Sequence, residues 1–424
     1  MVQPLSDPAG GVQPGSSLFW RINVALFLAG FASFSLLYCV QPLLPVFVQV
    51  FGVGAAASSL ALSLATGSLA LAIFGAGAWT EGRDKRRLML VSMVGAALLN
   101  LVAACSPSWH GLLLARALAG LTLGGVPAVA MAYLAERMAP QAVGRSVGLY
   151  VAGTAFGGMT GRIGTSLATD AWGWQAAVAG LSGLDLLAAA GFALLLPKFA
   201  PAASASAPQR GRPWREHIAI WRTHLGHPAL LCLFVIAFLG VGAFVAMFNY
   251  VGFLLMGEPF HWSAAHIGWV FLAYVFAMVT SPVAGGLADR HGPLPVLLGG
   301  VAITALGVLL TWWPQAWAVV LGIVGLTVGF FAMHAVASGW VGRLAGAHKG
   351  HATSLYLLAY YLGSSVLGSW GGRFWEHAGW TGVCGFSLVA LAGVAGCGWR
   401  LRALARTAAQ ADACRRRVTG TSAA

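Results

Sequence analysis

Gly285-Gly286-Leu287-Ala288-Asp289-Arg290-His291-Gly292 is a short charged stretch between two long apolar runs, residues 269–282 before it and 296–310 after it. In a chain this apolar, the stretch predicts a tight, water-exposed hairpin between two membrane-length helices. A weaker copy in the first half, Gly77-Ala78-Trp79-Thr80-Glu81-Gly82-Arg83-Asp84-Lys85-Arg86-Arg87, also separates two apolar runs. Two such stretches at corresponding places indicate a duplicated chain.

The composition excludes a soluble protein. Of the 424 residues, 58% are hydrophobic and only 8% are charged, whereas soluble domains carry about 25% charged residues. The mean hydropathy is +0.79. No polar stretch is long enough to form an enzyme domain beside a single membrane anchor.

Twelve apolar runs have the length that a membrane-spanning helix needs, about twenty residues. Strands of a membrane barrel would be shorter and would alternate in polarity, so helices are expected. The runs are residues 22–47, 58–79, 88–105, 112–134, 143–167, 174–196, 229–256, 265–288, 296–313, 316–341, 352–374 and 380–401.

The basic residues gather on one side of the predicted membrane. Of the 24 Lys and Arg residues, only Arg116, Arg162 and Arg373 lie outside the tails and the connections that alternate helices place on the N-terminal side. By the positive-inside rule this side is expected to be cytoplasmic, with both termini there. The net charge of +13 is therefore a topology signal, and a nucleic-acid partner is excluded.

A polar segment rich in Pro, Ala and Ser divides the twelve predicted helices into six and six. The expected organisation is a cytoplasmic tail (1–20), a first six-helix bundle (21–197), a cytoplasmic linker (198–228), a second six-helix bundle (229–402) and a basic cytoplasmic tail (403–424). Both charged stretches then fall between the second and third helix of a bundle.

With this arrangement the chain resembles the major facilitator superfamily, whose motif between the second and third helices reads G-x-L-A-D-R-x-G-[RK]-[RK]. Gly285, Leu287, Ala288, Asp289, Arg290 and Gly292 match it, and in the first half Gly77, Glu81 and the basic residues around Arg86 match it in part. The resemblance covers the whole chain. It implies an all-α membrane protein with twelve transmembrane helices in two six-helix bundles around a central cavity.

The resemblance also implies a cytoplasmic gate at these stretches. An acid there can face the positive N-terminal end of a helix from the other bundle. Glu81 is expected to face the eleventh helix near Thr353, and Asp289 the fifth helix near Arg145 and Ser146. The alternative is a solvated turn whose charges only set topology. The expected gate residues are Gly77, Glu81, Arg86, Gly285, Asp289, Arg290 and Gly292.

Two further motifs point toward proton coupling. Arg116 and Gly120 on the fourth helix resemble the superfamily's R-x-x-x-G motif, whose arginine faces the cavity; the alternative is that Arg116 reaches the outer surface. On the fifth helix, the segment from Gly153 to Arg162 resembles the G-x-x-x-G-P-x-x-G-G motif of drug:proton antiporters, with Gly158 in place of the proline and Arg162 in place of the last glycine.

The same segment, G-G-M-T-G-R, is similar to a bacterial subset of arabinose-efflux-type and acriflavine-type permeases. The spacing of Gly153, Gly157 and Gly161 predicts a small-residue face for close helix packing. Asp185 is an acid well inside the sixth helix. Arg162 and Asp185 are expected at similar depths on adjacent helices, as a structural ion pair; a proton-carrying role for Asp185 is the alternative.

His334 on the tenth helix is the best-placed titratable group for the cavity, since the unperturbed pKa of histidine is about 6.5. A neutral, hydrogen-bonded histidine is the alternative. Gln41-Pro42 is expected to break the first helix and free a carbonyl group for a ligand. Each substrate-binding candidate could equally be a packing residue. The candidates are Tyr38, Gln41, Asn249, Tyr250 and Ser338.

The sequence contains no nucleotide-binding loop, no pair of catalytic carboxylates and no metal-ligand spacing, so no cofactor, no metal and no enzymatic activity are expected. We expect a monomeric inner-membrane secondary transporter whose central site is lined by helices one, four, seven and ten. It would export a small, neutral or amphipathic organic compound in exchange for protons. Sugar or metabolite uptake, and a non-transporting receptor or scaffold, are the alternatives.

Overall fold

The computed structural model describes residues 11–79, 83–198 and 214–420, and these form helices without a β-strand. The elements are α1 (Ser17–Tyr38), η1 (Gln41–Leu43), α2 (Leu44–Phe51), α3 (Ala55–Ser58), α4 (Leu60–Trp79), α5 (Lys85–Ala104), α6 (Trp109–Leu123), α7 (Gly125–Arg137), α8 (Pro140–Leu195), α9 (Trp214–Gly226), α10 (Pro228–Met256), α11 (Ala264–Gly268), η2 (Trp269–Leu272), α12 (Ala273–His291), α13 (Pro293–Leu310), α14 (Ala316–Leu344), η3 (Gly346–His348) and α15 (Lys349–Gly420).

Ten segments among the described residues are long and apolar enough to cross a membrane. Two of them, in α8 and α15, each contain two spans. α8 is 56 residues long and bends at Gly173, where φ is 80° and ψ is 161°, a conformation that favours glycine. α15 is 72 residues long and bends at Ala378 and Gly379. Counting each part as a span gives the twelve helices that the sequence predicts.

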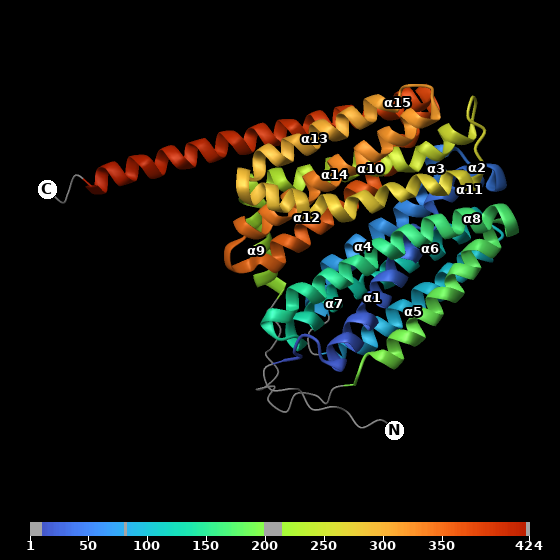
Figure 1. Ribbon diagram of the computed structural model, residues 1–424, viewed down its shortest axis with the longest axis horizontal. Coiled ribbons are helices and arrows are strands. Elements are labelled where there is room, and N and C mark those ends of the chain that lie inside the picture. The colour runs from blue at the N-terminus through green and yellow to red at the C-terminus, as the bar shows by residue number, and fades with distance from the viewer. Residues whose placement is uncertain (1–10, 80–82, 199–213, 421–424) are drawn as a thin grey trace.

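The spans form two groups, one made by α1–α8 and one by α10–α15 (Figure 1). In the first group α1 packs along α8, and in the second α10 packs along α15. The two groups meet where α15 lies against α3 and α4, and where α8 lies against α11. The short helix α9, which precedes the second group in the chain, packs against α10 and α15.

Glycines allow the main helix pairs to approach closely. A Cβ atom at Gly153, Gly157 or Gly161 of α8 would collide with the backbone of α1, at Phe27, Phe31 and Ser35 respectively. In the second group, a Cβ atom at Gly363 of α15 would collide with Phe238 of α10 in the same way. In lipid the hydrophobic effect does not drive helices together. Close van der Waals packing, which small residues at helix crossings allow, stabilises the helix pairs instead.

Gly157→Ala is therefore expected to destabilise the protein by about 1–3 kcal/mol, because the added methyl group forces two backbones apart. Gly164→Ala is the matched control, since a Cβ atom at Gly164 of the same helix meets nothing within 4 Å. Melting curves of the two purified variants in detergent measure the difference. Equal melting temperatures would contradict this account of the α1–α8 contact.

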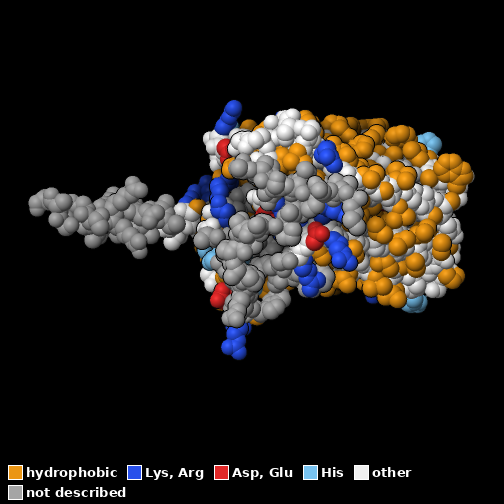
Figure 2. Space-filling view, turned by 90° about the horizontal axis from the view of Figure 1, so that it is seen from below, with side chains coloured by type: hydrophobic (Ala, Val, Ile, Leu, Met, Phe, Trp, Pro, Cys, Tyr) orange, Lys and Arg blue, Asp and Glu red, His pale blue; other side chains and the backbone are white. Residues whose placement is uncertain are grey.

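The surface separates into an apolar belt and one charged end (Figure 2). Exposed side chains such as Leu71, Val91 and Leu187 belong to the apolar belt, which suits contact with lipid. Lys and Arg side chains gather at the end of the bundle where α5 begins and α12 ends; we call it the basic end. There Lys85 pairs with Glu136 at 2.8 Å.

At the opposite end two carboxylates join the groups in equivalent ways. Asp170 accepts a hydrogen bond of 3.0 Å from the backbone N–H of Ala265, the second residue of α11. Glu376 accepts one of 3.0 Å from the N–H of Ala56, the second residue of α3. We call these two contacts the acid latches. Each places a negative charge at the positive end of a helix from the other group.

Candidate functional site

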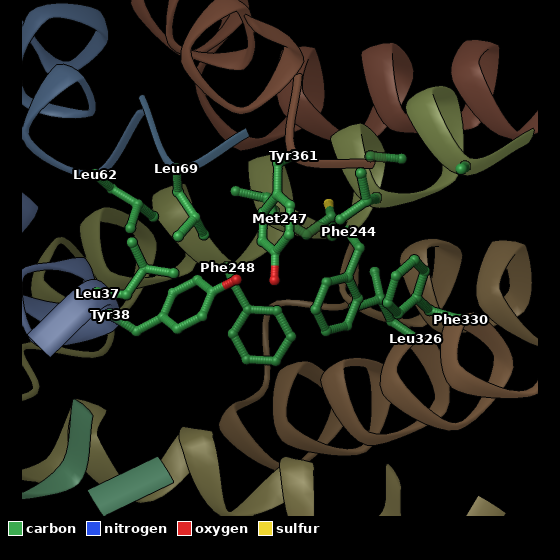
Figure 3. Packing of buried hydrophobic residues seen from close by; sticks show 14 of the residues in the cluster. Leu37, Tyr38, Leu62, Leu69, Phe244, Met247, Phe248, Leu326, Phe330 and Tyr361 are labelled. Atoms are coloured by element: carbon green, nitrogen blue, oxygen red, sulfur yellow. The ribbon is translucent and has the colours of Figure 1, made fainter. Parts of the chain in front are cut away.

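A cavity of about 500 Å³ lies between the two groups of helices. It extends from Tyr38, the last residue of α1, and Arg162 of α8 toward Gly148 and Pro282, which lie nearer the basic end. Figure 3 shows the hydroxyl groups of Tyr38 and Tyr361 pointing into the region beside Phe248. The cavity is lined by Phe34, Tyr38, Gly148, Val151, Ala152, Thr154, Ala155, Gly158, Arg162, Phe244, Val245, Tyr274, Ala277, Met278, Ser281, Pro282, Phe331 and Tyr360.

These lining residues belong to α1, α8, α10, α12, α14 and α15. The expectation that the fourth predicted helix lines the cavity is therefore wrong in this conformation, since α6 and α7 contribute none of the lining. α6 packs against α4 and α5 inside the first group instead. The first, seventh and tenth helices do reach the cavity.

Arg162 lies at the deep end of the cavity and is only 2% exposed. Its guanidinium group donates to Gln41 Oε1 at 2.6 Å, to the Gly158 carbonyl at 2.8 Å and to the Tyr274 hydroxyl at 3.2 Å. Its central carbon lies 3.9 Å from the ring centroid of Tyr38 and 4.5 Å from that of Tyr274. Arg162 therefore joins the first group to Tyr274 of the second.

A chain of side-chain amides continues from Arg162 across the interface. Gln41 Nε2 donates to Asn249 Oδ1 at 2.8 Å, and Asn249 Nδ2 donates to the Gly368 carbonyl at 3.2 Å. Both amides are buried, and neither lines the cavity. Of the candidates for substrate contact, these two lie behind the cavity wall, while Tyr38 forms part of the wall.

The expected ion pair between Arg162 and Asp185 does not form. Asp185 is fully buried and contacts the Ser35 hydroxyl, whose oxygen lies 2.9 Å from both carboxyl oxygens. Counting from the bend at Gly173 places the two residues at similar depths, but depth does not fix direction around a helix. Arg162 faces the cavity, whereas Asp185 faces α1.

Arg116 is fully buried inside the first group and does not line the cavity. It donates to the carbonyls of Leu36 and Leu37 at 2.8 and 2.6 Å, to that of Ala61 at 3.1 Å, and to Asn100 Oδ1 at 2.9 Å. Arg116 therefore does not reach the outer surface, and in this conformation it does not form part of the cavity wall.

Arg116 binds the end of the first helix, where the helix breaks. α1 ends at Tyr38, just before Gln41-Pro42, and the last four carbonyls of a helix lack partners within it. The carbonyls of Leu36 and Leu37 belong to this last turn. They bind Arg116, so the expectation that the break frees a carbonyl for a ligand is wrong for these two groups.

The remaining candidates lie away from the cavity wall. His334 is half-buried; its Nδ1 lies 3.0 Å from the Tyr356 hydroxyl and its ring stacks on Phe330. Tyr250 is buried and donates to the Ser369 carbonyl at 3.3 Å. Ser338 is exposed and donates to the Ala335 carbonyl of its own helix.

At the basic end, Asp289 contacts Arg343 of α14 at 3.7 Å, within its own group of helices. Arg145 instead lies over the rings of Phe19 and Trp20. The expected contact between Asp289 and the start of the fifth helix, Arg145 and Ser146, is therefore not made in this conformation. Arg290 is exposed, and Gly292 adopts a φ of 86°.

The structure describes only part of the first charged stretch, residues 77–87, because residues 80–82 lie outside the described ranges. Gly77 lies in α4, and Glu81 falls outside the described residues. Arg86 donates to the carbonyl of Leu196 at 2.8 Å and to that of Ala193, so it caps the end of α8. The backbone N–H groups of Arg86 and Arg87 donate to the carboxylate of Asp84, the N-cap of α5.

Sequence reasoning missed Tyr274, Ser35, Asn100 and the two latch acids as partners. Tyr274 sits in an aromatic run without a motif, so no local signal marks it. Asp170 and Glu376 were visible as the rare acids on the side poor in Lys and Arg. Their equivalent positions, at the end of the fifth and eleventh predicted helices, were the signal that could have revealed the latches.

Comparisons with known proteins agree with this architecture. The family model of the Major Facilitator Superfamily matches residues 26–255 and 243–417. The Inner membrane transport protein YnfM of Escherichia coli (strain K12) is 40% identical over 384 residues, 91% of each chain. The uncharacterized MFS-type transporter YybF of Bacillus subtilis (strain 168) is 37% identical, over 88% of this chain and 91% of that protein.

Solved structures share the fold. A bacterial homolog of the human lysosomal transporter Spinster, in an inward-facing and occupied conformation, superposes with a TM-score of 0.75 over 94% of this chain and 98% of that chain, at 13% identity. The nucleoside transporter NupG gives a TM-score of 0.71 over 91% and 99%, at 14% identity. At such identities the likeness concerns the fold alone.

Proposed function

Because the chain belongs to the Major Facilitator Superfamily and is a membrane transporter, we propose that it exports a small organic compound in exchange for protons. The observation that carries this proposal is the cavity between the two groups of helices. Side chains from both groups line it. A rocking motion of one group against the other would therefore open it to either side of the membrane in turn.

The contacts at the two ends of the protein are consistent with a state in which the cavity is closed at the opposite end and extends toward the basic end. The acid latches hold the groups together at the opposite end, while the cavity extends toward the basic end. We take the basic end as cytoplasmic, with both termini there, in the inner membrane. In the other state Asp289 would leave Arg343 and approach the start of α8 near Arg145. A single chain forms the whole cavity, so the transporter would act as a monomer.

Asp185 is our candidate for the proton-binding residue. An ionised carboxylate that is buried in a membrane protein without a cation costs several kcal/mol. The Ser35 hydroxyl lies 2.9 Å from the carboxyl oxygens and 3.1 Å from the Ala32 carbonyl, and it has only one proton to donate. Ser35 can therefore turn toward Ala32 when Asp185 is protonated, and toward Asp185 when it is not.

Proteoliposomes with an imposed pH gradient test this proposal. For any compound that the wild type moves, Asp185→Asn is expected to reduce gradient-driven transport at least tenfold and to retain exchange without a gradient. Glu258→Gln, an exposed acid-to-amide change, is the matched control. A pH-sensitive dye reports proton flux, and inverted vesicles report direction.

Three results would count against the proposal. Wild-type protein that moves candidate substrates without proton flux would refute antiport and favour uniport. Accumulation in the opposite direction would favour uptake. Unchanged gradient-driven transport in Asp185→Asn would leave antiport standing and remove Asp185 from it.

A further inference from the structure

Among the described residues that line the cavity, Arg162 carries the only formal charge. Its neighbours on the wall are mostly apolar or aromatic, including Phe34, Phe244 and Phe331. A buried cation in such surroundings loses the stabilisation of water. A partner of opposite charge would restore much of that stabilisation.

The protein supplies no such partner in the described part of the chain. The three acceptors of Arg162 are an amide oxygen, a backbone carbonyl and a phenol hydroxyl, all uncharged. Asp185, the buried acid in the second part of α8, binds Ser35 instead. A guanidinium group has five N–H donors, so one N–H on each terminal nitrogen of Arg162 has no acceptor within the described residues.

We propose that Arg162 binds the anionic head group of the transported compound, which makes the substrate class a singly charged amphipathic organic anion. A carboxylate suits the two free N–H groups, because arginine binds planar anions through two nitrogens. The aromatic wall around Tyr38 and Phe244 would hold the apolar body, and 500 Å³ accommodates a small organic molecule. A single cation balances a single negative charge, so multiply charged compounds are disfavoured.

Binding of an anion would also weaken the link between the two groups. An anion on the two free N–H groups would share the positive charge of the guanidinium group with the Tyr274 hydroxyl, the acceptor that belongs to the second group. It would weaken this hydrogen bond, which joins the two groups. Arg162 would thereby connect occupancy of the site to opening of the opposite end.

Three probes of nearly equal shape and different charge test the proposal: 2-naphthoate, 2-naphthamide and 2-naphthamidine. Binding to purified protein in detergent is measured by intrinsic fluorescence and by thermal shift. The wild type is expected to bind naphthoate at least tenfold more tightly than the amide, and the amidine most weakly. Arg162→Gln is expected to remove this preference, with amide binding changed less than threefold. Arg162→Lys is expected to retain part of it.

Two further variants separate a binding role from a structural one. Tyr274→Phe removes a competing acceptor and is expected to raise naphthoate affinity a few-fold, which loss of structure would not do. Arg400→Gln removes the same positive charge from an exposed residue far along α15. It is expected to leave the preference for naphthoate over the amide unchanged. Melting curves confirm that each variant is folded.

The naming of this ligand as a substrate rests on the proposed transport function, but the binding assay needs no gradient. Wild-type protein that binds none of the probes, or binds all three equally, overturns the proposal, as does an intact preference in Arg162→Gln. Loss of proton-coupled transport with an intact anion preference would refute only the antiport mechanism.

Discussion

Replacing Arg116 by leucine is expected to lower the melting temperature of the protein by roughly 3–7 °C. The change removes the Arg116 donor from the carbonyls of Leu36, Leu37 and Ala61 and from Asn100 Oδ1. The Leu36 carbonyl and Asn100 Oδ1 then keep only the weak thiol donor of Cys39. Each unpaired buried acceptor costs about 1–3 kcal/mol. The sum, about 3–6 kcal/mol if relaxation spares part of it, approaches the whole stability of many proteins.

The measurement is a melting curve of detergent-purified protein, together with the yield of monodisperse material. Arg116→Lys keeps the charge with fewer donors and is expected to fall between the wild type and Arg116→Leu. Arg400→Gln serves as the control for loss of an exposed arginine. An Arg116→Leu protein that melts normally but loses proton-coupled transport would show that the residue acts in coupling rather than in holding the end of α1.

Neutralising both acid latches is expected to shift the conformational equilibrium toward opening at the opposite end by about 30-fold. Each latch is exposed to solvent, so its carboxylate–helix interaction is worth about 1 kcal/mol after screening. Two equivalent latches then give about 2 kcal/mol, and 1.4 kcal/mol corresponds to a factor of ten. The double variant is Asp170→Asn with Glu376→Gln, which preserves side-chain size.

A reporter cysteine on the cavity wall at Ala277, introduced in a background without the native cysteines, measures this shift. Its rate of labelling by a membrane-impermeant thiol reagent from the opposite end should rise in the double variant. Each single variant should give about half of the free-energy change, since the two contacts are equivalent and share no residue. Glu258→Gln is the control. An unchanged labelling rate would show that the latches do not hold this end closed.

The spans and the packing face of α8 could be predicted because they depend on local sequence. Apolar length defines each span, and the four-residue spacing of Gly153, Gly157 and Gly161 marks the face of α8 that contacts α1. The bends at Gly173 and Gly379 occur at turn-forming glycines between two apolar runs. Such features need no knowledge of what lies on a neighbouring helix.

The side-chain partners could not be predicted in the same way. Counting residues from a hairpin gave the depth of Arg162 and Asp185, but their directions depend on how α1 packs between other helices. The break at Gln41-Pro42 was visible, whereas the arginine that binds the last turn of α1 comes from α6. The contact of Asp170 could not be predicted either, because the helix end that it contacts lies in the other half of the chain.

The bends in α8 and α15 have a consequence for the rotation of the helices that follow them. Because no loop separates the two parts of α8, the direction in which residue 162 points fixes the direction in which residue 185 points. One residue added at the bend would turn the second part by about 100°, carrying Asp185 away from Ser35. The corner at Gly173 therefore acts as an angular reference: it keeps the acid turned toward α1 while the arginine of the same helix is turned toward the cavity.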